Sequence, residues 1–155
     1  MAYIQSNKTE EGCVFCIEPT RLDGPENLIV YRSERAFVIL NRFPYTTGHV
    51  MVVPFDHQPS LELLDAATRA EMMELVSRVL VVLQQAYHPQ GFNVGINIGT
   101  AAGAGIADHI HMHIVPRWSG DTNFMSSVGS TRILPEVLDD TYQRVKEAWH
   151  VGEES

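Results

Sequence analysis

One long amphipathic segment constrains the fold of this 155-residue chain more than any other feature of the sequence. Between Ala66 and Tyr87, apolar residues recur at steps of three and four: Met72, Leu75, Val76, Val79, Leu83 and Ala86. This spacing lines one face of an α-helix, which must then be covered by another layer of the protein. Ser60 and Asp65 are candidate caps before the helix, and Pro89 and Gly91 lie where it must end. The pattern predicts a helix over Ala66–Tyr87.

The segments on either side of this helix are short, apolar and rich in β-branched residues. Five of them are predicted strands: Leu28–Tyr31, Ala36–Asn41, His49–Pro54, Phe92–Ile98 and Ile110–Val115. A loop containing Pro44 and Gly48 joins the second run to the third, which predicts a hairpin. A weaker helix is expected at roughly Glu136 to Trp149, after Pro135. Strands around one long helix predict an α+β domain with the helix packed on an antiparallel sheet.

Length and composition favour one globular domain over residues 1–155, because 45% of the residues are hydrophobic. The formal net charge of −8 argues against a basic surface for a nucleic acid polymer or an anionic membrane, but a small anionic ligand needs only a local site. The polar segment Met1–Gly12 does not resemble a signal peptide, and no apolar run is long enough to span a bilayer. Only two cysteines are present, which is no disulfide framework. We therefore expect a cytoplasmic protein.

Three of the seven histidines alternate with apolar residues in the segment His109-Ile110-His111-Met112-His113-Ile114-Val115. On a strand, residues two apart face the same way, so the three imidazoles are expected on one face. Such neighbours stand about 6.6 Å apart along a strand, which puts the outer two about 13 Å apart. One tetrahedral metal ion with Zn–N bonds of about 2.0 Å cannot bind all three. We expect one end to serve a metal and the other an anion or a nucleophilic step.

The pair Cys13-Val14-Phe15-Cys16 has the spacing of half a zinc site. No second Cys pair exists, so the remaining ligands must be histidines, and His57 and His109 are the candidates. A redox-active dithiol and two buried structural thiols are the alternatives. The dithiol is disfavoured because the strand and helix that usually surround such a pair are absent from the pattern.

The loop from Gly99 to Gly105 consists almost entirely of Gly and Ala, so its backbone N–H groups are open to a phosphate. It is not a Walker A loop, because no Gly-Lys-Ser/Thr follows. Two other histidine-based sites are also excluded. A zinc deaminase needs His-x-Glu before its Cys pair, and an iron facial triad needs a carboxylate beside the histidines.

These residues resemble the histidine triad (HIT) superfamily of nucleotide hydrolases and transferases. The similarity covers a core over residues 13–125, followed by a C-terminal tail and helix over 126–150. Val115-Pro116-Arg117-Trp118 with Gly120-Asp121-Thr122-Asn123-Phe124 resembles the bacterial branch that includes diadenosine tetraphosphate phosphorylases. The resemblance implies a five-stranded antiparallel sheet in each protomer of a homodimer, with one sheet continuing across both.

The resemblance also implies roles for individual residues. His111 matches the nucleophile that attacks the α-phosphorus, His113 a phosphate contact, His49 a supporting histidine and Asn97 an amide near the phosphate. Asn41 matches the ribose ligand. The residues that match the base, the phosphate loop and the substrate-facing C-terminal motif are Phe15, Phe37, Ile39, Gly103, Gly105 and Trp118. The bacterial branch further implies a structural zinc ion bound by Cys13, Cys16, His57 and His109.

One position departs from the family pattern. Many members carry Gln or Ser about four residues before the first histidine of the triad, and this chain has Gly105 there. The acceptor of the second step, water or inorganic phosphate, therefore stays open. The leading hypothesis is a hydrolase or phosphorylase acting on a dinucleoside polyphosphate through a nucleotidyl-His111 intermediate. A nucleoside phosphoramidate or aminoacyl-nucleotide hydrolase is the enzymatic alternative, and a nucleotide-sensing or adaptor module is the non-enzymatic one.

Overall fold

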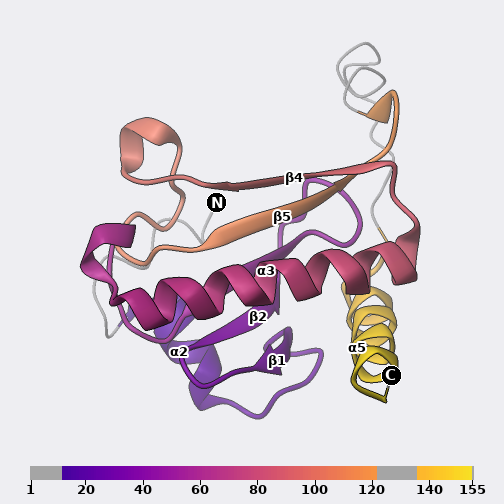
Figure 1. Cartoon of the computed structure of the whole chain (residues 1–155), viewed down its shortest axis with the longest axis horizontal. Coiled ribbons are helices and arrows are strands. Elements are labelled where there is room, and N and C mark those ends of the chain that lie inside the picture. The colour runs from indigo at the N-terminus through magenta and orange to yellow at the C-terminus, as the bar shows by residue number, and fades with distance from the viewer. Residues whose placement is uncertain (1–11, 122–135, 155) are drawn as a thin grey trace.

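A computed structural model describes residues 12–121 and 136–154 of the chain (Figure 1). Thr122–Phe124 of the C-terminal motif lie outside the described residues. The helices are α2 (Val14–Ile17), α3 (Ala66–Tyr87) and α5 (Leu138–Glu154), with single 3-10 turns η2 (Glu18–Thr20), η3 (Leu61–Leu63) and η4 (Thr100–Ala102). The strands are β1 (Ile29–Arg32), β2 (Ala36–Leu40), β3 (Val50–Pro54), β4 (Gly91–Ile96) and β5 (Met112–Arg117).

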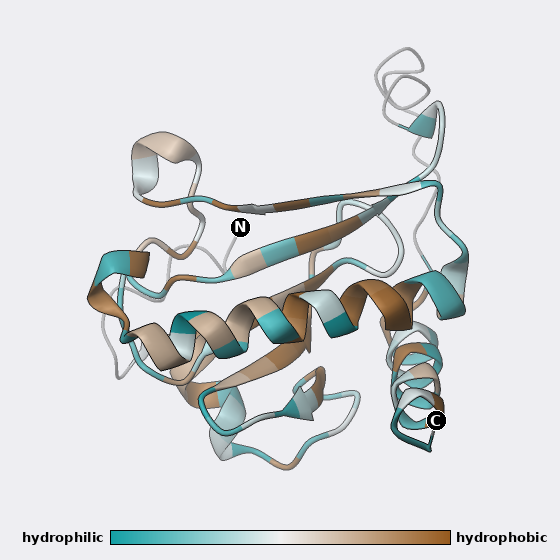
Figure 2. Ribbon diagram, viewed as in Figure 1, coloured by the Kyte–Doolittle hydropathy of each residue, from teal (hydrophilic) through white to brown (hydrophobic). Residues whose placement is uncertain are grey.

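The five strands form one antiparallel sheet in the order β1-β2-β3-β5-β4, which confirms the predicted α+β class. The predicted hairpin is β2–β3, and β5 inserts between β3 and β4. Every residue of β2 and β3 is buried, so the centre of the sheet is covered on both faces. The hydrophobic colouring of these central strands is visible in Figure 2.

Helix α3 has the bounds that its apolar periodicity predicts and lies across one face of the sheet (Figure 1). The Asp65 side chain caps it by accepting a hydrogen bond of 2.7 Å from the Thr68 N–H. The helix ends at His88, whose left-handed backbone (φ 49°) allows its N–H to donate to the Gln84 carbonyl.

The C-terminal helix α5 runs five residues beyond its predicted end at Trp149 and contacts both α3 and β1. Its buried face includes Tyr142, Val145 and Trp149. An ion pair of 2.8 Å between Arg78 of α3 and Glu153 ties the added turn to the long helix. The prediction stopped too early because this last turn is held by a tertiary contact and carries no apolar pattern of its own.

The strand boundaries differ from the prediction by one or two residues, with local causes. β1 starts at Ile29 because Leu28 has a positive φ of 65°, which a strand residue cannot adopt. β5 starts at Met112, two residues later than predicted. Just before it, Ile110 N–H donates to the Gln58 carbonyl, and the His109 ring bonds the Pro54 carbonyl. His109 and His111 therefore precede the strand, and the expectation of three histidines on one straight strand is wrong.

No helix in the described part of the chain is long and apolar enough to cross a membrane.

Candidate active site and metal centre

A cavity of about 290 Å³ opens beside the start of β5 and brings together residues from distant parts of the sequence. Its lining comprises Phe15, Asn41, Phe43, Tyr45, Met51, Asn97, Gly103, Gly105, Ile106, His111 and His113. The sheet register explains part of this grouping, because Ile39, Met51, His113 and Gly95 stand opposite one another across four adjacent strands. Directly paired residues share a face of an antiparallel sheet. The cavity therefore lies on the sheet face that carries His113.

His111 is held in one tautomer by its own backbone neighbourhood. Its Nδ1 lies 2.9 Å from the His109 carbonyl oxygen, which can only accept a hydrogen bond. The proton of a neutral His111 ring is therefore on Nδ1, and the lone pair is on Nε2. Because His111 also lines the cavity, it is a fixed imidazole equipped for nucleophilic attack.

His113 is oriented through His49, a buried residue that immediately precedes β3. The Tyr45 backbone N–H donates to His49 Nδ1 over 3.2 Å, so a neutral His49 carries its proton on Nε2. That Nε2–H lies 2.9 Å from His113 Nδ1 and donates to it. His113 then carries its own proton on Nε2. The adjacent rings of His111 and His113, with centroids 4.8 Å apart, thus have opposite capacities at Nε2: one accepts a bond and the other donates.

Burial keeps these histidines neutral. It lowers the pKa of His113 to about 4, helped by the neighbouring His111. It lowers the pKa of His49 to about 3, with further lowering by His113 and His111. Burial also lowers the pKa of His111, against the raising effect of the His109 carbonyl. At neutral pH the cavity therefore presents uncharged imidazoles, and its lining contains no Lys or Arg among the described residues.

Next to the cavity, one nitrogen or sulfur atom from each of Cys13, Cys16, His57 and His109 lies within 4.8 Å of the others. Cys13 and Cys16 come from the two ends of one turn, in which the Cys13 carbonyl accepts from the N–H groups of Cys16 and Ile17. His57 follows β3, and His109 precedes β5. All four residues of the predicted ligand set are therefore brought together.

The atoms of this cluster fit a zinc ion. A tetrahedron with bonds of about 2.0 Å to nitrogen and 2.3 Å to sulfur has edges of about 3.3 Å between nitrogens and about 3.5 Å between nitrogen and sulfur. The two Nδ1 atoms lie 3.1 Å apart, and the measured S···N separations are 3.3, 3.4 and 3.6 Å. His109 Nε2 donates to the Pro54 carbonyl over 2.8 Å, which leaves the Nδ1 lone pair toward the cluster. The donor set and its tautomer are those of a closed metal site.

Not every predicted substrate residue reaches the cavity. Phe15, Asn41, Asn97, Gly103 and Gly105 line it. Phe37 and Ile39 are buried core residues of β2. Neither belongs to the described lining of the cavity. Phe37 packs on Phe55 with ring centroids 5.1 Å apart. Trp118 follows β5 at its far end, where its backbone N–H donates to Asp121.

Two exposed aromatic residues that were not predicted for the site, Phe43 and Tyr45, flank Pro44 in the β2–β3 loop and line the cavity. Their backbone N–H groups also fix the site, because Phe43 donates to Asn41 Oδ1 over 2.9 Å and Tyr45 donates to His49. Two aromatic residues around a proline in a hairpin loop are a detectable signal, since a loop residue there has no core to fill.

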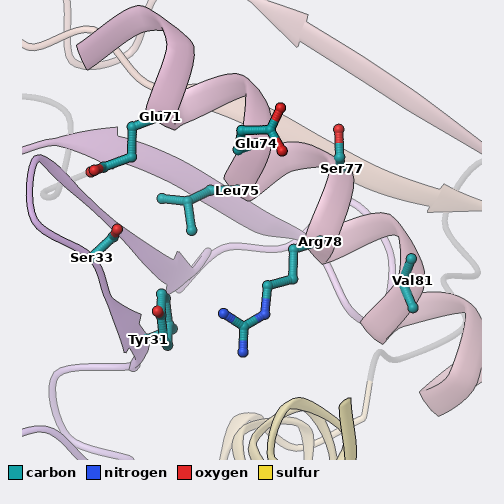
Figure 3. Close-up of a pocket in the computed structure, with 8 residues that line it drawn as sticks. All are labelled: Tyr31, Ser33, Glu71, Glu74, Leu75, Ser77, Arg78 and Val81. Carbon is teal, nitrogen blue, oxygen red and sulfur yellow. The ribbon is translucent and has the colours of Figure 1, made fainter. Parts of the chain in front are cut away.

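A second hollow, between β1 and α3, contains no histidine or cysteine (Figure 3). Its main cation, Arg78, lies over the rings of Tyr31 and Trp149, 4.6 and 4.4 Å from their centroids, and pairs with Glu153. These contacts join α3 to β1 and α5 and give the hollow a structural role.

Comparison with known proteins identifies the class defined by this fold and site. The model of the HIT domain family matches residues 25–120, and the chain belongs to that family. It is 39% identical to the AP-4-A phosphorylase of Mycobacterium tuberculosis over 132 residues, which cover 85% of this chain and 68% of the relative. It is 32% identical to the adenylylsulfatase HINT3 of Arabidopsis thaliana over 118 residues, covering 76% of this chain and 58% of that protein.

One solved structure with the same fold contains zinc. A zinc-bound histidine triad family protein from Mycobacterium smegmatis superposes with a TM-score of 0.74 at 27% identity, covering 94% of this chain and 99% of that one. The expected HIT fold is confirmed, and the Cys₂His₂ cluster indicates a metal site in a chain whose structural relative binds zinc.

Proposed function

We propose that this chain is a nucleotide hydrolase or phosphorylase that cleaves a dinucleoside polyphosphate at the α-phosphate. The observation that carries the proposal is the fixed tautomer of His111, whose Nε2 lone pair belongs to a residue of the cavity wall. The similarity to a relative named AP-4-A phosphorylase supports this substrate class.

The chemistry follows from the two Nε2 atoms. The His111 lone pair attacks the α-phosphorus, a P–N bond forms, and the P–O bond to the leaving polyphosphate breaks with its electron pair on oxygen. His113, with a proton on Nε2, donates a hydrogen bond to the phosphate oxygens. In the second step an acceptor oxygen attacks phosphorus, and the P–N electrons return to His111. A water acceptor releases its proton to the solvent as it bonds to phosphorus, whereas an inorganic phosphate acceptor attacks through an oxygen that carries no proton.

The phosphates are bound by N–H donors rather than by cations. The described cavity lining contains the Asn97 amide and the His113 ring, and Gly103 and Gly105 add backbone next to them. Nothing within 4 Å would meet a Cβ at Gly103, so the loop leaves open space for a ligand. We assign Asn41 to the ribose hydroxyls, since its carboxamide follows β2 and Phe43 N–H fixes its orientation.

Product analysis decides between the two acceptors. With diadenosine tetraphosphate as substrate, hydrolysis gives AMP and ATP, whereas phosphorolysis gives ADP and ATP. The reaction is run with and without inorganic phosphate, and the nucleotides are separated by chromatography. ADP that appears only with phosphate assigns phosphorolysis, and AMP formed in both conditions assigns hydrolysis.

His111→Ala tests the nucleophile. Turnover of diadenosine tetraphosphate should fall by at least about 10⁴-fold, because removing a covalent nucleophile stops both steps. Nucleotide binding, measured by calorimetry with AMP, should persist. His150→Ala is the control, since this exposed histidine on α5 should retain turnover. Full activity of His111→Ala would contradict the proposed role of His111 as nucleophile.

We further propose that Cys13, Cys16, His57 and His109 bind one structural zinc ion. A site closed by four protein ligands has no open position for water or substrate, so the metal stabilises the fold there. Protein purified without added metal should contain about one zinc per chain, and Cys13→Ser should lower both that content and the melting temperature. A content well below one equivalent, with stability unchanged by a chelator, contradicts this assignment.

The second candidate function is cleavage of an adenylyl compound with a different leaving group. The similarity to an adenylylsulfatase favours this candidate. Initial rates with diadenosine tetraphosphate, adenylyl sulfate and an adenosine phosphoramidate at equal concentration rank the three leaving groups. A rate at least tenfold higher for either of the last two would replace the dinucleotide as the preferred substrate.

We also propose that the protein is a homodimer joined along β4. This strand ends the sheet, and the side chain of Val94 is 44% exposed. The resemblance to HIT proteins supports a sheet that continues into a second copy, which would hydrogen-bond the outer edge of β4.

A further inference from the structure

The helix turn that supplies both cysteines of the metal cluster also supplies one wall of the nucleotide cavity. Phe15 lies between Cys13 and Cys16 in α2, is only 1% exposed and lines the cavity. Its ring meets His109 edge-on at 5.5 Å and His111 at 4.9 Å between centroids. One aromatic side chain therefore touches a predicted metal ligand and the predicted nucleophile.

A second link runs through the backbone. The His109 ring belongs to the metal cluster, while the His109 carbonyl accepts the Nδ1–H bond that fixes the His111 tautomer. Any shift of His109 therefore acts on His111 by two routes: the carbonyl and the ring of Phe15.

Two residues of the cluster, Cys13 and Cys16, flank Phe15 in the short helix α2. The helix has four residues, too few for cooperative helix stability, and its N-cap Cys13 makes no side-chain capping hydrogen bond to the first turn. The helix packs on the core through buried Phe15 and Cys13 and partly buried Val14 and Cys16, and just beyond it the Asn27 side chain donates to the Glu18 carbonyl. An ion bound by both cysteines and by His109 would add one metal–sulfur bond on each side of Phe15.

We propose that metal binding and nucleotide binding are coupled in this protein, with Phe15 as the positioning residue that transmits the coupling. The inference rests on the proposed function for the identity of its ligand, a nucleoside monophosphate. Metal fixes α2 and His109, Phe15 then stays against His111, and the nucleotide meets a preformed wall. Without metal the nucleotide must order this wall as it binds, which costs affinity.

Coupling is reciprocal, which gives the experiment two independent arms. In the first, AMP affinity is measured by calorimetry for the zinc-loaded and the chelated protein, and we expect about a tenfold weaker Kd after chelation, within the usual range of such effects. In the second, zinc is transferred from loaded protein to a chromophoric chelator with and without AMP. Zinc affinity should rise by the same factor when AMP is present. The second arm serves alone if the chelated chain unfolds.

Phe15→Leu keeps an apolar side chain but removes the ring contacts with His109 and His111. It should retain about one zinc per chain, and its AMP affinity should change less than twofold on chelation. Tyr31→Leu is the matched control, because Tyr31 stacks on Trp149 at the α5 side of the sheet. That variant should keep the full coupling factor even if its stability falls.

Failure of the coupling is separable from failure of the proposed function. Equal AMP affinity with and without zinc, in protein that has lost its metal, overturns the coupling. If AMP binds neither form, the proposed function fails. The link between the metal cluster and His111 is then tested separately, by the NMR signal of the nitrogen-bound ring proton of His111. A His111 Nδ1–H signal that shifts or exchanges faster on zinc removal supports the link through His109. A signal unchanged on zinc removal overturns it.

Discussion

At the scale of single residues, the hydrogen bond made by one ring nitrogen decides what the other can do. His111 and His113 carry the same ring, yet a carbonyl oxygen accepts a hydrogen bond from Nδ1–H of the first and His49 donates to Nδ1 of the second. The proposed nucleophile and the proposed hydrogen-bond donor are therefore distinguished by their partners and not by their residue type. His109 repeats the principle, with its Nε2 on Pro54 and its Nδ1 toward the metal cluster.

The low pKa of His49 makes stability depend on pH. Burial and the neighbouring histidines lower this pKa from 6.5 to about 3 in the folded chain, so below pH 6.5 the unfolded chain binds a proton that the folded chain does not. The contribution of His49 is complete above pH 6.5 and is lost as the pH falls toward 3. We expect the free energy of unfolding to fall by up to about 1.4 kcal/mol per pH unit from this group.

His49→Gln should flatten that slope by about one proton, as measured by urea unfolding at a series of pH values between 6.5 and 4. Zinc release at low pH affects the variant and the parent alike, because His49 is not in the metal cluster. His88→Asn is the control, since His88 is exposed and Asn tolerates its left-handed backbone. Equal slopes for parent and His49→Gln would show that His49 already titrates normally.

Residue identities could be predicted from the sequence wherever the side chain itself carries the chemistry. The four members of the metal cluster and the pair His111 and His113 are of this kind. Phe43 and Tyr45 carry a detectable signal, two aromatic residues around a proline in a loop, but their contacts could not be predicted, because these depend on backbone N–H groups that every residue has and on a loop path set by the sheet. Phe37 and Ile39 show the converse, since an apolar residue beside a site in the sequence is equally suited to the core.

At the scale of elements, periodicity predicted the long helix to the residue, and the strands less well. A helix boundary is determined by the local sequence, here by Asp65 before α3 and Pro89 after it, whereas a strand boundary depends on the partner strand. β5 starts late because His109 and Ile110 bond to Pro54 and Gln58 outside the sheet ladder. The same departure turns His109 toward the cysteines, so the prediction failed at the point where the chain builds its metal cluster.

The cap of α3 gives a test at this scale. Asp65→Ala should lower the free energy of unfolding by about 0.5–2 kcal/mol, because the Thr68 N–H loses its acceptor. Asp65→Asn keeps a capping oxygen and should retain most of the stability, while it removes the weak 3.8 Å ion pair with Arg35. Chemical denaturation of the three proteins measures both effects. If Asn destabilises as much as Ala, the ion pair and not the cap is the stabilising contact.

At the scale of the whole molecule, the chain has a formal net charge of −8, and the described lining of its cavity has no basic side chain. The overall field therefore opposes a polyphosphate, and binding has to come from short-range N–H donors in a partly enclosed site. Such an arrangement suits the proposed small nucleotide better than a long polyanion, which needs an extended positive surface.

The two edges of the sheet differ in a way that bears on assembly. At β1, helix α5 supplies donors to the strand carbonyls, with Tyr142 Oη on Ile29 at 3.0 Å and Lys146 Nζ on Val30 at 2.8 Å. At β4, no described element pairs with the outer edge, and an apolar groove lined by Leu80, Val81 and Phe92 lies alongside. An exposed edge beside an apolar surface is a site for pairing with another chain.

The proposed homodimer is therefore expected to depend on β4. Light scattering should give about twice the chain mass of 17.4 kDa for the parent protein. Val94→Lys should shift the mass toward that of one chain, because two lysines would meet across the symmetric edge. Leu22→Lys is the matched control, since Leu22 is 94% exposed in the loop before β1 and should leave the mass unchanged. Circular dichroism confirms that both variants fold. A folded Val94→Lys protein that keeps the parent's doubled mass would place the interface elsewhere, and a parent with the mass of one chain would contradict the dimer.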